Sequence, residues 1–93
     1  MRDKEQTVKQ IIMEAAAKFF NIESNRLSLI TVTDCDLSTD KRNATVYISV
    51  LPDSRRDDAL NFAKRKRGEL RTFISKKTGL KHIPYFDVML TNE

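Results

Sequence analysis

The chain has 93 residues and a formal net charge of +4, which suits one domain with a modest hydrophobic core. Its hydrophobic fraction of 40% and charged fraction of 32% argue against a disordered chain. No apolar run approaches the roughly 20 residues that span a bilayer, the first residues lack the apolar core of a secretory signal, and the single cysteine cannot form an internal disulfide. We therefore expect one domain, residues 1–93, in the cytoplasm, with no membrane partner.

The first predicted element is an amphipathic helix that begins near Lys4. Apolar residues follow helical spacing from Val8 to Phe20, and Asp3 followed by Gln6 resembles a capping box. The apolar stripe predicts that this helix packs on a sheet; binding to a partner or to a membrane surface is the less favoured alternative. The helical period is lost between residues 21 and 28, which predicts a loop there.

Two strands follow, and we expect them to pair as an antiparallel hairpin. The segment Leu29–Leu37 is rich in β-branched residues, and its alternation falters after Val32, which predicts a bulge or an exposed strand end. Turn-forming residues occupy 38–43 and place Lys41 and Arg42 at the hairpin tip. Residues 44–50 alternate cleanly between apolar and polar side chains and predict the second strand.

A helical region from Ala59 to Lys77 is predicted to break in its middle. Apolar residues recur there at intervals of three and four, but the same helical face is occupied in the middle by Lys66. Burying an unpartnered lysine is very costly, and Gly68 is a poor helix former. We therefore expect two helices joined at a kink formed by Lys66, Arg67 and Gly68, which would direct the four consecutive cations 64–67 to solvent.

Capping signals mark the ends of this region. Ser54, with Asp57 three residues later, is predicted to cap the first of the two helices, and Gly79 is predicted to end the second. A last strand is expected at Tyr85–Leu90. The order helix, strand, strand, helix, kink, helix, strand predicts a two-layer α+β domain, with a three-stranded sheet covered by helices on one face.

Residue types that carry catalysis or bind metals are sparse. His82 is the only histidine and Cys35 the only cysteine, and neither has the neighbours of a metal site or of an activated nucleophile. Asp34 and Asp36 share strand parity, but no base or metal partner supports acid–base chemistry. A chain with two glycines cannot form a Gly-rich phosphate loop. We therefore predict no enzymatic activity, no metal and no cofactor.

Basic residues are concentrated in the second half of the chain. Residues 55–82 contain ten Lys or Arg and three acids, a local balance of +7. Such a run is often only a solvated face, but its density favours phosphate backbones, and the scarcity of nearby aromatic residues favours structured RNA over single-strand base reading. The predicted RNA-binding residues are Lys64, Arg65, Lys66, Arg67 and Arg71, with Arg55, Arg56, Lys41 and Arg42 as secondary candidates.

Several sequence motifs occur in an order that is typical of one bacterial family. The paired strands ITVTDCDL and ATVYISVL, and the later segments GELRTFI and LKHIPYFDVML, resemble those of ribosome-binding factor A over roughly residues 7–91. That family resembles a type II KH domain in topology, without the GxxG loop and with a kink built on Ala-x-Gly between two helices. The kink matches here at Gly68, whereas Lys66 takes the alanine position.

The resemblance implies a factor for ribosome biogenesis and rRNA processing, which binds the immature small subunit during late maturation. Its expected partners are small-subunit ribosomal RNA and free small ribosomal subunits, and we expect it to be a monomer. A different hypothesis is a protein-interaction module that uses the first helix or a sheet edge, with no direct RNA contact. Nuclease treatment and charge reversal distinguish the two, because only RNA binding is sensitive to both.

Overall fold

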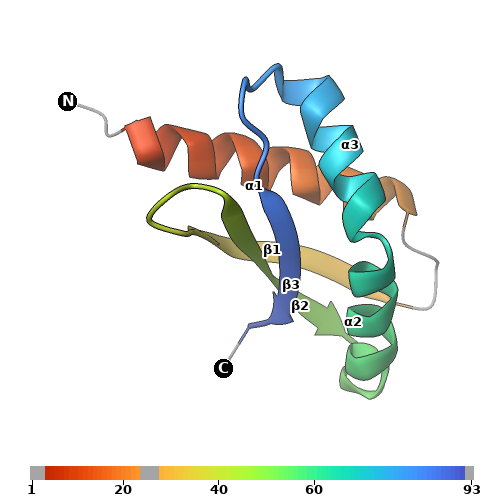
Figure 1. Cartoon of the computed structure of the whole chain (residues 1–93). Coiled ribbons are helices and arrows are strands. Elements are labelled where there is room, and N and C mark those ends of the chain that lie inside the picture. Colours follow the sequence, from red (N-terminus) through yellow and green to blue (C-terminus); the bar gives the residue numbers. More distant parts are fainter. Residues whose placement is uncertain (1–3, 24–27, 92–93) are drawn as a thin grey trace.

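The computed structural model describes residues 4–23 and 28–91, with the side chains from residue 8 onwards, and they form two layers (Figure 1). The elements in chain order are α1 (Lys4–Glu23), β1 (Leu29–Leu37), β2 (Asn43–Leu51), the short 3₁₀ helix η1 (Asp53–Arg55), α2 (Arg56–Arg65), α3 (Arg67–Thr78) and β3 (Tyr85–Leu90). The helices α1, α2 and α3 all contribute buried residues to one face of the sheet. This arrangement confirms the predicted α+β fold with type II KH-like topology.

The three strands form one mixed sheet in the order β1-β2-β3. Strands β1 and β2 pair antiparallel, as predicted for a hairpin. Strands β2 and β3 pair parallel, with Ala44 opposite Phe86 and Val46 opposite Val88. A parallel pair requires a crossover connection, and α2 and α3 provide it. The crossover therefore places α2 and α3 beside the edge strand β3, as the contacts of Asp87 described below confirm.

A bulge in β1 explains why its alternation falters. The register against β2 shifts between Val32 and Asp34, so Thr33 is the extra residue. The shift turns Cys35 into the core, where its side chain is fully buried, and Leu37 packs against the same core. Burial raises the pKa of the Cys35 thiol to about 11, which keeps it protonated at neutral pH and fits a packing role.

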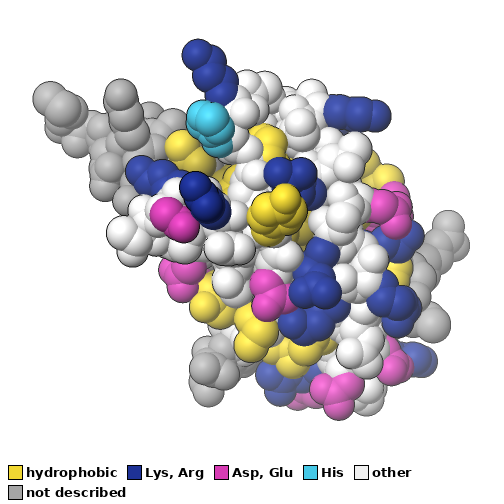
Figure 2. Space-filling model, in the orientation of Figure 1, with side chains coloured by type: hydrophobic (Ala, Val, Ile, Leu, Met, Phe, Trp, Pro, Cys, Tyr) yellow, Lys and Arg dark blue, Asp and Glu magenta, His cyan; other side chains and the backbone are white. Residues whose placement is uncertain are grey.

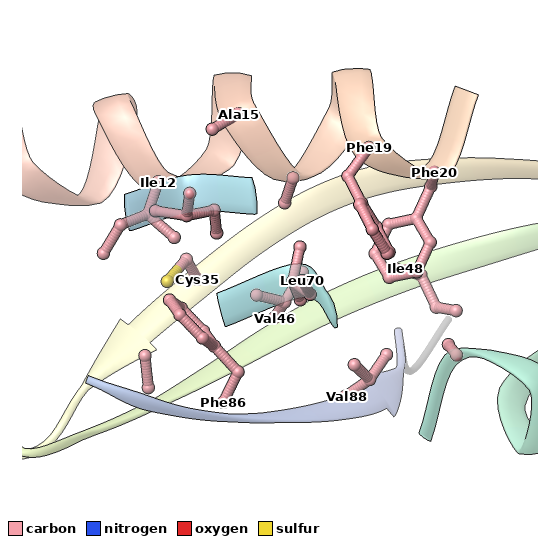
Figure 3. Packing of buried hydrophobic residues seen from close by; sticks show 14 of the residues in the cluster. Ile12, Ala15, Phe19, Phe20, Cys35, Val46, Ile48, Leu70, Phe86 and Val88 are labelled. Carbon is pink, nitrogen blue, oxygen red and sulfur yellow. The ribbon is translucent and has the colours of Figure 1, made fainter. Parts of the chain in front are cut away.

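The hydrophobic core lies between the sheet and the helices. Figure 3 shows Phe19 and Phe20 pointing from α1 towards the strands, and the two rings meet edge to face with centroids 5.3 Å apart. The largest fully buried side chains are Phe20, Ile12, Ile48, Leu70, Ile74, Val46, Val88 and Cys35. No charged or polar side chain is buried among the residues that the structure describes. Every lysine and arginine of α2 and α3 must therefore reach the surface.

Two boundary predictions were wrong. Helix α1 continues to Glu23 instead of ending at residue 20, because Ile22 is 66% exposed and breaks the apolar period while the backbone stays helical. Ser54 does not cap α2: it lies inside η1, which leads directly into α2, and Arg55 takes the N-cap position without a side-chain hydrogen bond. The predicted cap at Asp3 lies outside the described residues, as does the loop 24–27.

The two glycines should respond in opposite ways to replacement by alanine. Gly79 ends α3 with φ of 67°, as predicted, so Gly79→Ala should lower the free energy of unfolding by about 1 kcal/mol. Gly68 lies within the first turn of α3, and a Cβ added there meets nothing within 4 Å. Gly68→Ala should therefore raise stability by up to about 1 kcal/mol through helix propensity. Urea unfolding of both variants measures this, and destabilisation by Gly68→Ala would show that the kink needs glycine.

Candidate nucleic-acid interface

The long helical region breaks as predicted, but the break is at Lys66 alone. Arg67 and Gly68, which were predicted to form the kink with it, are the first two residues of α3. Helix α2 ends at Arg65, and Lys66 has φ of −95° and ψ of 8°, outside the helical region. The N–H of Lys66 donates to the carbonyls of Phe62 and Ala63, at 3.2 and 3.1 Å, and its own carbonyl accepts the N–H of Leu70 at 2.8 Å. The backbone hydrogen bonds are thus kept through the break, while Ala63 before it and Leu70 after it are both buried.

The side chain of Lys66 is directed towards acids and is not turned freely to solvent. Its ammonium lies 3.5 Å from Glu23 Oε1 at the end of α1 and 3.3 Å from Glu69 Oε2 in α3. It also lies 5.7 Å from the ring centroid of Phe62. The hydrogen bond to Glu69, with the charges of both carboxylates, raises the pKa of Lys66. A lysine on the core side of the helix is accommodated because its stem reaches outward to two carboxylates.

Lys64 and Arg67 share one carboxylate on the edge strand. Lys64 Nζ lies 2.9 Å from Asp87 Oδ1, and Arg67 Nη1 lies 3.2 Å from the same oxygen. Arg67 Nε also donates to the carbonyl of Lys64 at 2.9 Å, across the break. The hydrogen bond from Lys64 and the other polar contacts outweigh desolvation and lower the pKa of Asp87. These bonds tie the break to β3.

Arg65 differs from the other three cations. It is exposed and makes no ion pair with any residue that the structure describes. The expectation that the kink turns all four cations 64–67 freely to solvent is therefore corrected. Three of them are paired with acids that lie on α1, α3 and β3. Figure 2 shows the result, with basic side chains grouped over α2 and its junction with α3, and acidic ones set among them.

The remaining candidates have different surroundings. Arg71 donates to the carbonyls of Ile83 and Pro84, at 2.9 and 3.2 Å, so it holds the segment before β3. Arg55 lies 3.9 Å from Asp58, too far for a strong pair, and Arg56 is exposed. Lys41 and Arg42 are exposed on the hairpin turn, beyond the far end of α3, and do not join the cations at the break.

The acids that pair with these cations were not anticipated from the sequence. Glu23 and Asp87 are 43 and 20 residues away from Lys66 and Arg67, and no local pattern links them. The only available signal was Asp87 on the polar parity of a predicted strand. Within residues 4–23 and 28–91, no group of three or more potential ligands could hold a metal ion, and no helix there is long and apolar enough to cross a membrane.

Replacing Asp87 by asparagine tests the shared carboxylate. Asp87→Asn keeps an oxygen for the backbone N–H of Val88 but removes the charge, so stability at neutral pH should fall by less than about 1 kcal/mol, as for a half-exposed ion pair. Because the folded pKa is lowered, the stabilisation is present above the unfolded pKa of about 3.9 and is lost as the pH falls through the folded value. Urea unfolding over a series from pH 7 downwards should show the full difference between variant and parent at pH 7, and a difference that shrinks as the pH falls below the unfolded pKa.

The fold is a KH-like α+β domain, because a mixed sheet carries helices on one face and the helical region breaks between the buried residues Ala63 and Leu70. The helices at this break carry a basic surface. The chain belongs to the ribosome-binding factor A family, whose model matches residues 4–90.

Relatives agree with this assignment, and solved structures agree with the fold. Ribosome-binding factor A of Thermodesulfovibrio yellowstonii is 37% identical over 86 residues, which is 90% of this chain and 73% of that protein. The Fervidobacterium nodosum protein is 37% identical over 77% of this chain and 59% of its own length. The crystal structure of the Thermus thermophilus factor superposes with a TM-score of 0.83 at 17% identity, over 95% of this chain and 97% of that one. A model of the Thermus thermophilus factor fitted into a cryo-electron microscopy map of a 30S–RbfA complex has a TM-score of 0.74 at 21% identity, over 85% and 86%.

Proposed function

We propose that this protein is a non-enzymatic assembly factor that binds the immature small ribosomal subunit in the cytoplasm and contacts its ribosomal RNA through α2 and α3. Membership of the family supports the ribosomal partner. The ribosome-binding factor A of Thermus thermophilus is described in a complex with the 30S subunit, which supports the small subunit as the particle that is bound.

The proposed RNA contact is supported mainly by the group of cations at the break. Arg65 is exposed and has no ion pair with any described residue, while Lys64 and Arg67 lie close to it in the chain and share the single carboxylate of Asp87. A half-exposed ion pair is worth about 1 kcal/mol or less, so a phosphate can replace Asp87 as the partner of either cation. Arginine adds forked hydrogen bonds to the phosphate oxygens. Under this proposal Arg65 binds a phosphate directly, and Lys64 and Arg67 bind one after the phosphate replaces Asp87 as their partner.

Sedimentation with purified ribosomal particles tests the proposal. The protein should co-migrate with free small subunits and not with assembled translating ribosomes, and binding should weaken steeply as salt is raised, because each phosphate contact releases counterions. Equal binding to both particles, or binding that salt does not change, would contradict it.

One observation favours the alternative of a protein-binding surface. Ile22 is 66% exposed at the end of α1 and borders a hollow of about 400 Å³ that is also lined by Phe19 and Phe73. An exposed apolar side chain beside such a hollow fits a protein partner. Under this alternative, capture of a partner should survive nuclease treatment and should be lost in Ile22→Asp.

A further inference from the structure

A second hollow lies beyond the far end of α3 from the kink, between the hairpin turn and the connection from α3 to β3. Its volume is about 600 Å³, within the range of roughly 300–1,000 Å³ that is typical of small-molecule sites. Its apolar lining comes from three parts of the chain: Val8 on α1, Leu37 at the end of β1, and Leu80 and Pro84 after α3. None of these side chains is more than half exposed, so together they form an apolar floor.

Three cations line the same hollow. Lys41 and Arg42 belong to the hairpin turn and Lys81 to the α3–β3 connection. All three are exposed, and none has an ion pair with any residue in the described ranges. His82 also borders the hollow. Figure 2 shows this face, with the histidine in cyan, basic side chains on several sides and hydrophobic surface between them.

Asp40 is the one acid among the described residues that line the hollow, and it does not neutralise these cations. The carboxylate of Asp40 accepts a hydrogen bond from the hydroxyl of Ser38 at 2.7 Å and another from the backbone N–H of Arg42 at 3.1 Å. These two hydrogen bonds, the hydroxyl first, lower the pKa of Asp40. The carboxylate is therefore engaged in fixing the turn, in which Lys41 adopts a positive φ of 62°. Lys41 and Arg42 line the hollow without an ion pair to any acid in the described ranges.

Backbone hydrogen bonds fix the two sides of the hollow relative to one another. The N–H of Tyr85 donates to the carbonyl of Arg42 at 2.9 Å, which joins the turn to the start of β3. Arg71 holds the carbonyls of Ile83 and Pro84 from α3, and its guanidinium lies 4.5 Å from the ring centroid of Tyr85. The site is therefore formed before any ligand binds, which lowers the entropic cost of binding.

We propose that this hollow is a second RNA-binding site, which accepts one unpaired nucleotide. The base lies on the apolar floor, and the phosphate is bound by Lys41, Arg42 and Lys81. An inorganic anion would leave the apolar floor unused, and an apolar ligand would leave three cations unused, whereas a nucleotide uses both. Unpaired bases are the parts of an RNA that proteins can take out of the stack.

The identity of the ligand as RNA rests on the proposed function. Helix α3 has 12 residues, so the hollow lies roughly 18 Å along the helix from the break, at 1.5 Å per residue. One RNA that reaches both sites would be held at two points, and the second contact would then be intramolecular.

Titration with adenosine 5′-monophosphate, followed by backbone amide NMR, tests the site. The amides of residues 37–42 and 80–84 should shift with the nucleotide. Inorganic phosphate should reproduce only the shifts near the cations, and adenosine only those near the floor. The double variant Lys41→Gln/Lys81→Gln should lose at least tenfold in nucleotide affinity, because two of three phosphate contacts are removed. The matched control Lys18→Gln/Lys76→Gln has the same change of charge at exposed positions outside the hollow and should bind like the parent.

Three outcomes would overturn the site: no shifts in these segments, shifts that inorganic phosphate reproduces in full, or equal losses in the two double variants. The proposed function fails separately. If the parent protein does not sediment with small subunits but its hollow still takes the nucleotide, the function is wrong and the site stands. If the parent protein binds small subunits but its hollow does not bind the nucleotide, the proposed site is wrong and the proposed function stands.

Discussion

Phe20→Ala should lower the free energy of unfolding by about 3–5 kcal/mol, the usual cost of removing a fully buried phenylalanine. Phe20 is 0% exposed, and its ring packs edge to face against Phe19 between α1 and the sheet. Truncation leaves a cavity that cannot close, because the strands on the other side are held by their hydrogen-bonded register. A loss of this size is a large share of the 5–15 kcal/mol that holds a typical domain together.

Ile22→Ala is the matched control, since it removes apolar atoms from the same helix at a position that is 66% exposed. Its effect should stay within about 0.5 kcal/mol. Urea unfolding followed by circular dichroism measures both variants. Similar losses in the two would mean that α1 does not pack on the sheet as described.

Arg65→Gln should weaken binding to small subunits by about three- to tenfold at 0.1 M salt, and should lower the slope of log affinity against log salt by about 1. The physical reason is that an exposed cation without an acidic partner among the described residues can bind a phosphate without first losing an ion pair. The folded structure should be unaffected, because the side chain makes no recorded hydrogen bond or ion pair in the described part of the chain.

The neighbouring substitution Lys66→Gln is the control, because it removes the same charge one residue away. Lys66 is paired with Glu23 and Glu69, so its loss should change subunit affinity and salt slope less than the loss of Arg65. Filter binding of labelled small subunits over a salt series compares the two. Equal effects would show that only the total charge matters; a larger effect of Lys66→Gln would contradict the assignment of Arg65 as the leading contact.

The local elements could be read from the sequence because each depends on side-chain periodicity. The strands were predicted at Leu29–Leu37 and Tyr85–Leu90, and both bounds agree with the structure. The break at Lys66 was predictable because a lysine on an apolar helical face conflicts with burial. Periodicity gave the wrong end for α1, because Ile22 is an exposed apolar residue that departs from the apolar stripe although the backbone there is still helical.

Which acids pair with the cations of the candidate site could not be predicted from the sequence in this way. Asp87 meets Lys64 and Arg67 only when β3 lies parallel to β2, and Glu23 meets Lys66 only when α1 packs against α3. Neither contact can be recognised from local residue spacing. The second hollow is a similar case. Its floor and cations come from α1, the end of β1, the hairpin turn and the segment after α3. From the sequence, Lys41 and Arg42 were predicted only as secondary RNA-binding residues, and Lys81 was counted only in the charge of residues 55–82.

The sequence by itself determined the succession of helices and strands, the position of the break and the basic character of the second half, because those depend on residue order and composition. Only the tertiary structure decided which cations are left without an acid. Ion pairs form between groups that are close in space, and here the partners of Lys66 and Arg67 lie 43 and 20 residues away. The crossover that makes β3 an edge strand thus brings Asp87 to Lys64 and Arg67, whereas Lys66 is paired with acids of α1 and α3. Arg65 has no ion pair with any residue that the structure describes.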